Sequence, residues 1–458
     1  VHARVHVESH PGKLDVIQTV IPGGELPNEE ILLMAHLFEY YYKQGANDNK
    51  SGSAVILEVG RVIQKMIQEG KIPRPKRSIR ILWEPEGWGT FAWMKKYPKA
   101  LTKIKAVIDM DMVGEGHSLC GTRFHIFDTP DSLPHFFNAV MKEFAEYVRL
   151  NSGWMDRVGE KSFTDIIASP TGSRDAFYYD MIHFNPRFFN ENWIEIPSIL
   201  FNCGPDPFYH SSEDRPDKCD PTQLKRAAFL GTAAALYLAD LDRDDLSSLI
   251  PLVMAEEEVR LGADSKKAIQ VLSRSNSDNI HQNYKEALNI IRHGLKRYRG
   301  VILSIGSYLH FGEKEQKELA DLVPNEKTYV QGPLYRYYMS LCRMLNRKPE
   351  KPTLTAEETR LSRLIPERLV GYELLVNLMF LEDSLDDPDI KRKIRLNQAG
   401  RDVTWEVLNF SDGIRNIVDI RDAVAAEFAP VEVSLEEVEE YLKILEKAGV
   451  VRISMKED

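Results

Sequence analysis

The chain has 458 residues, of which 43% are hydrophobic and 28% are charged, and these are ordinary proportions for a folded globular protein. They exclude collagen-like, largely disordered and multi-spanning membrane proteins. The net charge of −10, from 59 basic and 69 acidic residues, argues against a protein that coats a polyanion. This length allows two or three domains.

Four cysteines are too few and too scattered for a disulfide framework. We therefore expect a reducing compartment, or a protein indifferent to redox conditions, and predict a cytoplasmic protein. No apolar run reaches the roughly 18–20 residues that a membrane-spanning helix needs, so no membrane contact is expected. Residues 1–8 alternate like a strand already in progress, which is typical of a fragment rather than of a natural start.

The first 240 residues alternate short apolar runs with helical patterns. From Ser51, apolar residues recur with a period of 3.6 as far as Gly70, which predicts a helix. Buried strands are predicted at 31–35, 79–83, 106–110 and 198–202. Strands that alternate with helices indicate an α/β sandwich with a mostly parallel sheet.

After this region the pattern is helical, for example at 223–241 and 284–299, and a stretch rich in proline and charge at 346–353 is typical of a linker. Near the end, Ser434 and Glu437 form a capping-box pattern that predicts the start of a helix. A helix followed by a short strand at 450–453 indicates a small winged-helix unit. The predicted domains are therefore 1–245, a helical extension at 246–350, and a linker with a winged-helix-like domain at 351–458.

Six potential metal ligands lie at or just beyond the ends of predicted strands or ahead of the first long helix. In an open α/β sheet, ligands gather in the crevice outside the carboxyl ends of the strands. Imidazole and carboxylate donors together suit zinc better than magnesium. Their number exceeds the need of one tetrahedral ion and fits two ions that share a carboxylate. These residues are His36, Asp48, Glu84, Glu86, Asp111 and His210.

Each candidate also has an ordinary structural explanation. A histidine after a strand is usually a polar residue near the surface, an aspartate ahead of a helix is usually an N-cap, and a loop glutamate is usually solvated. Asp111 is the exception, because it interrupts an apolar stretch between Val107 and Val113, where an unpaired charge is costly. The prediction therefore depends on the joint pattern.

The order of these motifs resembles the co-catalytic di-zinc aminopeptidase family, whose relatives include leucine aminopeptidases, glutamate carboxypeptidase II and glutaminyl cyclases. Gly45-Ala-Asn-Asp-Asn-Lys-Ser-Gly52 is similar to the bridging-aspartate motif of the family, and Asp109-Met-Asp-Met-Val-Gly114 to its next aspartate motif. Ile196-Pro-Ser and Tyr209-His-Ser-Ser-Glu-Asp214 are similar to its closing histidine segment. The resemblance covers roughly residues 1–240, and the tail resembles the winged helix of an outlying aminopeptidase-like branch.

The resemblance implies two zinc ions. It implies that His36 and Asp111 hold one ion, that His210 and a glutamate hold the other, and that Asp48 bridges both. In the family, an adjacent glutamate pair supplies a general base and then a ligand. Pro85 splits this pair here, and keeping the order makes Glu84 the base and Glu86 the ligand. The outlying branch has a single glutamate, and under that alignment Glu86 is the important residue.

The sequence departs from the family at the histidine motif, which here reads His36-Leu-Phe38 without the usual second aspartate. Glu39 and Asp109 are the candidates to replace that aspartate. Arg174 and Tyr209 are the candidates for substrate binding. Each could instead have a purely structural role: Arg174 in a salt bridge to a nearby acid, and Tyr209 in aromatic packing.

These features predict a zinc-dependent exopeptidase, an aminopeptidase that hydrolyses peptides with a metal-activated water. One alternative is a catalytically degraded peptidase fold that binds or regulates a partner, and another is a single-zinc cyclase-type enzyme. The acidic tail opposes phosphate binding, so no nucleic acid is expected. We expect instead that the C-terminal domain forms a homo-oligomer contact or binds a peptide.

Overall fold

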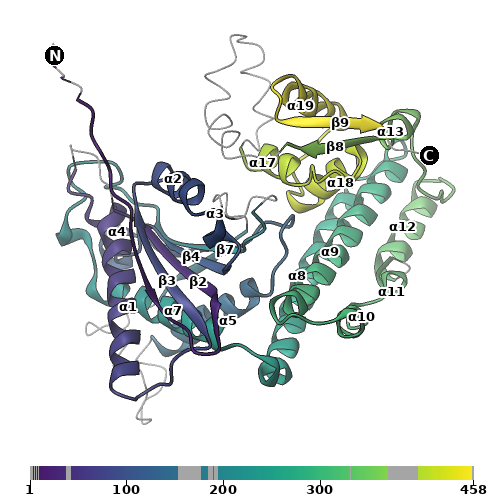
Figure 1. The fold of residues 1–458 in the computed structure, drawn as a ribbon. Helices are drawn as coiled ribbons and strands as arrows, with labels where there is room; N and C mark the ends of the chain where they lie inside the picture. Colours follow the sequence, from purple (N-terminus) through teal and green to yellow (C-terminus); the bar gives the residue numbers. More distant parts are fainter. Residues whose placement is uncertain are drawn as a thin grey trace. The chain divides into compact units, whose positions relative to one another are not determined.

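The computed structural model describes residues 10–37, 43–152, 177–183, 189, 194–330, 332–369 and 401–455, together with residues 4, 6 and 8 (Figure 1). The chain divides into two compact units. One contains Val1–His125, Tyr147–Asp180 and Phe201–Asp240, and the other contains the remaining residues. Among the described helices, none is long and apolar enough to cross a membrane. The three-domain division drawn from the sequence stays a prediction.

A seven-stranded sheet with the order β1-β3-β2-β4-β7-β5-β6 forms the centre of the fold (Figure 1). β2 (Leu26–His36) lies between β3 (Arg77–Glu84) and β4 (Ile104–Met110) and runs parallel to both, whereas β1 (Ile17–Ile21) pairs antiparallel with β3 at the edge. The predicted α/β fold with a mostly parallel sheet is confirmed. The other strands are β5 (Arg123–Phe127), β6 (Tyr179–Ile182) and β7 (Ser198–Gly204).

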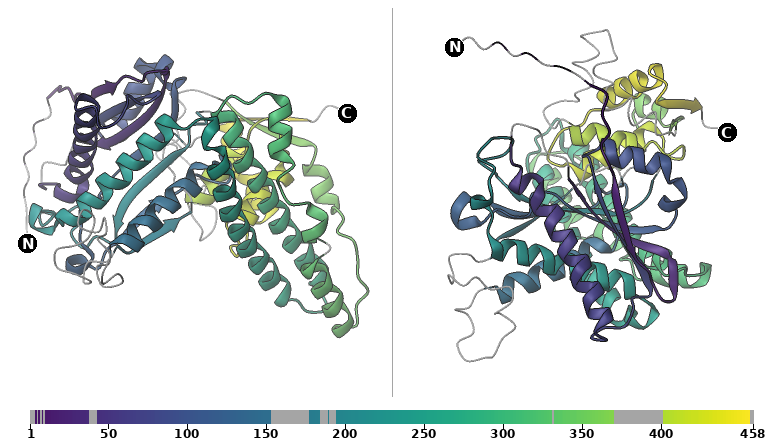
Figure 2. Two further views of the ribbon diagram at one scale, coloured as in Figure 1. Left: turned by 90° about the horizontal axis from the view of Figure 1, so that it is seen from below. Right: turned by 60° about the vertical axis from the view of Figure 1, so that its left-hand side comes forward.

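Two helices, α1 (Gly52–Gln68) and α7 (Pro221–Asp240), pack against each other and against the central strands (Figures 1 and 2). The apolar run at 31–35 in β2 is almost completely buried, as expected for a strand that is covered on both faces. Glycines allow these helices to lie close to the sheet. A Cβ at Gly60 would meet Ile81 at 2.4 Å, and one at Gly231 would meet Met110 at 2.2 Å.

Four further helices accompany this sheet in the sequence: α2 (Trp88–Lys96), α3 (Pro98–Leu101), α4 (His117–Cys120) and α5 (Phe137–Asn151). The second unit contains the helices α8 (Leu246–Ser273) and α9 (Ile280–Tyr308), which pack along each other (Figure 2). They are followed by α10 (Glu313–Ala320), α11 (Glu326–Val330), α12 (Pro333–Met344) and α13 (Ala356–Leu361).

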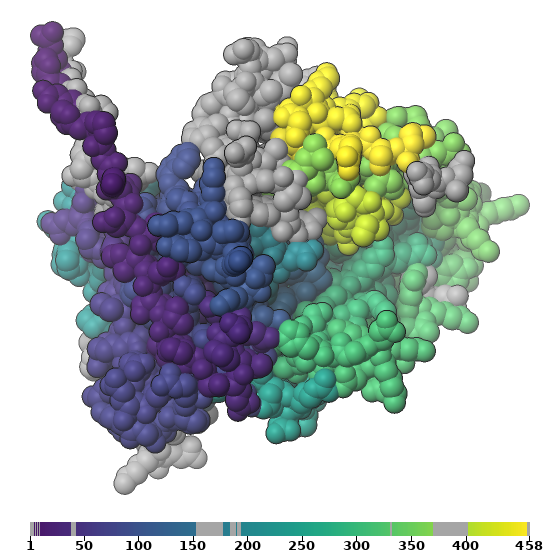
Figure 3. Space-filling model, viewed as in Figure 1, coloured from purple at the N-terminus to yellow at the C-terminus, as the bar shows by residue number. Residues whose placement is uncertain are grey.

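The C-terminal part of the second unit folds around its own apolar core and appears as a compact yellow body in Figure 3. Ser434 accepts a hydrogen bond from the backbone N–H of Glu437 at 3.2 Å, so the predicted capping box is present. The tail as a winged-helix domain stays a prediction. Its described elements are β8 (Leu364–Arg368), α17 (Arg401–Asn409), α18 (Ile417–Glu427), α19 (Leu435–Lys447) and β9 (Val451–Met455), and β8 pairs antiparallel with β9.

The start of α1 lies against the end of β4. A Cβ at Gly52 would come within 2.0 Å of the carbonyl oxygen of Met110 and within 2.4 Å of the side chain of Asn49. Only glycine fits here without moving backbone, because no flexible side chain can yield to the added methyl group.

We predict that Gly52→Ala lowers the free energy of unfolding by about 3 kcal/mol, the upper end of the usual cost of overpacking. Gly262→Ala in α8 is the control, because a Cβ there meets nothing within 4 Å. The Gly262→Ala variant is expected to leave the free energy of unfolding unchanged or to raise it slightly. Chemical denaturation measures both variants, and equal stabilities would show that the contact at Gly52 is relieved cheaply.

Candidate functional site

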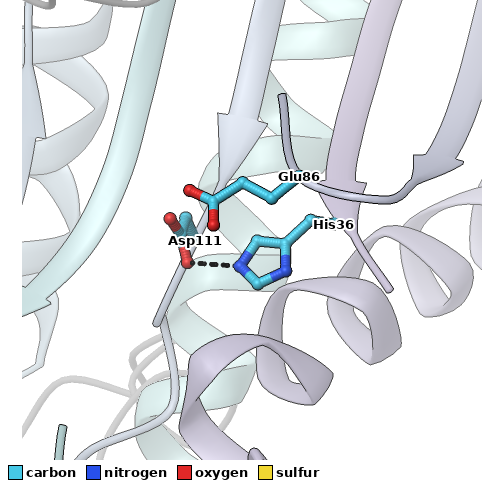
Figure 4. Close-up of side chains that lie close together, drawn as sticks. All are labelled: His36, Glu86 and Asp111. Atoms are coloured by element: carbon cyan, nitrogen blue, oxygen red, sulfur yellow. Dashed lines mark hydrogen bonds and ion pairs between the residues drawn. The ribbon is translucent and has the colours of Figure 1, made fainter. Parts of the chain in front are cut away.

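The polar ends of three parallel strands form the site. His36 is the last residue of β2, Glu84 is the last residue of β3, and Asp111 directly follows β4. Because these strands run parallel, their carboxyl ends meet at one edge of the sheet. Figure 4 shows His36, Glu86 and Asp111 directed toward one another from this edge.

The donor atoms of the site lie at contact distances. His36 Nε2 lies 3.3 Å from Asp111 Oδ1 and 3.1 Å from Asp48 Oδ1. One ligand atom from each of His36, Glu86 and Asp111 can be chosen so that all three lie within 4.8 Å of one another. His210 Nε2 lies 3.2 Å from the other carboxylate oxygen of Asp48, Oδ2. The structure therefore brings together the five residues predicted as metal ligands.

These distances suit shared coordination of a cation. In a tetrahedral zinc shell with bonds of about 2.0–2.2 Å, neighbouring ligand atoms lie about 3.4 Å apart. The contacts of His36 and His210 with Asp48 are close to this spacing. Two imidazoles with three carboxylates are also the donor mixture that zinc accepts. The residues present therefore fit a zinc centre in which Asp48 offers one oxygen to each side.

Asp48 owes its position to Asp214, which is fully buried. The Asp214 carboxylate accepts hydrogen bonds from the backbone N–H of Asn47 at 2.7 Å and from that of Asp48 at 3.1 Å. Asn47 in turn donates its side-chain amide to Asp206 at 3.1 Å. The segment Ala46–Ser51 (η1) is thus held by groups about 160 residues away in the sequence.

Asn49 ties the same segment to the end of β4. Its amide nitrogen donates to the carbonyl of Met110 at 2.8 Å, and its Oδ1 accepts the backbone N–H of Met112 at 3.1 Å. Met112 and His210 both have left-handed backbones, with φ of 63° and 54°. Such conformations are uncommon outside glycine and cluster at functional sites. Asp48 and Asp111 are therefore fixed relative to each other by main-chain contacts.

The charge of His36 responds to its carboxylate neighbours. Burial by itself would lower the pKa of His36, but its hydrogen bonds to Asp111 and Asp48 and the charges of Asp111 and Glu86 outweigh burial and raise the pKa to about 11. Without metal, an imidazolium thus balances these carboxylates. A bound cation takes over that role, so metal binding releases a proton.

The two glutamates after Trp83 have different surroundings. Glu84 is buried and its Oε2 accepts the backbone N–H of Thr90, at the start of α2, at 3.0 Å. Burial, with the charge of nearby Asp109, raises the pKa of Glu84 to about 8. Glu86 is exposed and faces His36 and Asp111. The geometry therefore gives Glu86 access to the site and makes Glu84 a buried support.

The remaining candidates have separate outcomes. The ring of Tyr209 stacks on that of His210, with centroids 3.7 Å apart. Partial burial and the charges of Asp48, Asp111 and Glu86 raise the pKa of Tyr209, so its hydroxyl stays protonated and can donate. Asp109 is buried beside Glu84. Arg174 and Glu39 lie outside the described residues.

Sequence reasoning missed three residues that the site depends on: Lys43, Asn49 and Asp214. Lys43 Nζ contacts the Oδ2 of Asp48 and donates to its backbone carbonyl at 2.9 Å. Its side chain is only 1% exposed. Asn49 and Asp214 stand in the motifs quoted above, but their roles depend on partners that only the fold reveals. The feature that identifies Asp214 as important is the burial of its carboxylate, which only the three-dimensional structure shows.

A second group that satisfies the same distance test lies in the second unit, where Asp131, His183 and Glu427 each offer a ligand atom. Here Asp131 already accepts a hydrogen bond from His293 at 2.8 Å and pairs with Arg260 at 3.2 Å. An additional cation would meet this positive charge, so we interpret the group as an ion-pair network.

Comparison with protein-family models finds a match to part of the chain. Residues 15–235 match the sequence model described as peptidase family M28. No curated protein matches the chain.

The chain is also similar to solved structures of aminopeptidases and spans about half of their length. The zinc aminopeptidase BSAP from Bacillus subtilis is 20% identical, with 48% of this chain and 49% of that chain covered and a TM-score of 0.35. An aminopeptidase from Aneurinibacillus sp. strain AM-1 is 19% identical, with 49% and 47% covered and a TM-score of 0.33. The LapA aminopeptidase from Legionella pneumophila is 17% identical, with 50% and 58% covered and a TM-score of 0.34.

We predict that Asp214→Asn weakens zinc binding by about 10- to 100-fold. This is the usual effect of changing a residue that orients a metal ligand without contacting the metal itself. An amide keeps the size of the carboxylate but cannot accept both backbone N–H groups equally well. Zinc titration of metal-free protein measures the change. Asp217→Asn is the control, because Asp217 is exposed and its carboxylate pairs with Lys218 and Arg215. Equal affinities for both variants would contradict the role of Asp214.

Proposed function

We propose, from the match of residues 15–235 to the sequence model of peptidase family M28, that the chain is a zinc-dependent metallopeptidase of the aminopeptidase type. The proposed substrates are peptides with a free amino end. The observation that supports this most strongly is the carboxylate of Asp48, whose two oxygens face His36 and His210 separately. A carboxylate in that position is suited to join two cations.

The residues around the centre have distinct proposed roles. His36, Asp48, Asp111 and His210 would hold zinc, which supplies a water of lowered pKa and Lewis acidity toward the scissile carbonyl. Glu86, which is exposed and adjacent to this set, would accept the proton of the attacking water and return it to the leaving amine.

Tyr209 is the proposed hydrogen-bond donor to the oxygen of the scissile carbonyl as negative charge develops on it. Its hydroxyl is protonated at neutral pH because burial and nearby carboxylates raise its pKa. The same carboxylates favour the α-ammonium of a peptide over its α-carboxylate, since unlike charges attract. This preference supports an aminopeptidase rather than a carboxypeptidase.

The domain division, the location of the protein and the C-terminal domain are part of the same proposal. The division into 1–245, 246–350 and 351–458 remains our working description of the domains. Four free cysteines agree with a cytoplasmic location, which we retain as a proposal. The C-terminal winged-helix-like domain is proposed to bind protein or to mediate oligomer formation.

We predict that purified protein contains zinc and releases the N-terminal residue from peptides with a free amino end, but not from N-acetylated copies. Chelation should abolish the activity, and added zinc should restore it. His36→Ala should lower kcat/KM more than about 100-fold, because loss of a metal ligand costs more activity than loss of a residue that only orients a ligand. His10→Ala is the control at an exposed histidine. Metal-free protein that still binds peptides would favour the regulatory alternative.

We predict that Glu86→Gln lowers kcat by about 10²- to 10⁴-fold, the usual contribution of a general base, while folding is unchanged. Glu84→Gln is the matched comparison. The pKa of Glu84 is raised to about 8, so this side chain is largely uncharged at pH 7 and an amide replaces it with little change. Steady-state kinetics at pH 7 measures both variants. A larger loss for Glu84→Gln would instead make Glu84 the base.

A further inference from the structure

The bridging carboxylate has a cationic partner of its own. Lys43 Nζ contacts Asp48 Oδ2 and also donates to the Asp48 carbonyl oxygen at 2.9 Å. The side chains of Lys43 and Asp48 are 1% and 5% exposed, so the pair is shielded from water. An ammonium that is buried to this extent is stable only while it is paired.

This ammonium occupies the side of Asp48 where a second cation would bind. Oδ1 of Asp48 faces His36, whereas Oδ2 faces both His210, at 3.2 Å, and Lys43. A metal ion held between Asp48 Oδ2 and His210 must therefore share Oδ2 with Lys43 or displace it.

The charges lead to the same conclusion. Asp48, Glu86 and Asp111 carry three negative charges when ionised. One divalent ion on the His36 side together with the Lys43 ammonium supplies three positive charges, so the centre is balanced with a single metal. A second divalent ion adds charge to a balanced site and lies next to the ammonium, and both effects oppose its binding.

We propose that Lys43 competes with the second metal ion for Asp48. The first ion then binds tightly on the side of His36 and Asp111, and the second binds weakly beside His210, when Lys43 is displaced. This inference rests on the proposed function, because it needs a metal centre at these residues. In this proposal, the Lys43–Asp48 ion pair determines how many metal ions the centre holds at a given metal concentration.

The test is a titration of the full, metal-stripped chain with zinc, followed by calorimetry and by metal analysis after equilibrium dialysis. Wild-type protein should bind one ion tightly and a second in a separate, weaker phase. In Lys43→Met, which keeps the length of the side chain without its charge, the second ion should bind at least about tenfold more tightly. Lys43→Arg retains the charge and should resemble the wild type.

Lys50→Met is the matched control, because Lys50 lies in the same segment but bonds the Gln44 carbonyl at the surface. It should leave both phases unchanged. Two equivalent zinc ions in the wild type, or an unchanged second phase in Lys43→Met, would overturn the role of Lys43 even if activity is normal. Two equivalent ions in the wild type would overturn the proposal without any variant, so a variant that fails to fold does not remove the test. Protein that binds no zinc at all would instead overturn the proposed function.

Discussion

The carboxylate of Asp48 is the group that the rest of the site depends on. It contacts His36 through one oxygen, and His210 and Lys43 through the other. A buried carboxylate with partners on two sides must be held rigidly, since a displacement of about 1 Å toward one partner would break the contacts with the others. The rigidity comes from main-chain hydrogen bonds. Asp214 fixes the segment from one side and Asn49 from the other, so that the position of the bridging group is determined by backbone rather than by a free rotamer.

This arrangement explains why a glycine stands at position 52, at the start of α1. Asn49 can reach both the Met110 carbonyl and the Met112 N–H only if α1 begins against the end of β4. Gly52 permits that approach, because any side chain would collide with the Met110 carbonyl. The packing of a helix on the sheet and the spacing of the two carboxylates proposed to bind metal, Asp48 and Asp111, are therefore one constraint. The expected cost of Gly52→Ala is a cost to the site as well as to the fold.

Much of this could be predicted from the sequence. The period of apolar residues located the strands around 31–35 and 106–110 and the helix after Ser51, since burial on both faces leaves a continuous apolar run. Parallel strands also explain why His36 and Asp111 meet, as their carboxyl ends share an edge. The roles of Lys43 and Asp214 could not be predicted, because they depend on three-dimensional proximity. For the glutamate pair the sequence left two alignments open, and burial separates Glu84 from Glu86.

The comparison of two clusters shows that geometry alone does not define a metal site. In both the first and the second unit, three donors can be found within 4.8 Å of one another. Around His183, the carboxylate of Asp131 is already paired with the Arg260 guanidinium and hydrogen-bonded to His293. Around Asp48 the resident cations are a proton on His36 and the ammonium of Lys43. A metal can replace the proton directly, whereas an ammonium on a side chain has to be moved. The number of ions that the first centre holds therefore depends on how easily each resident cation leaves.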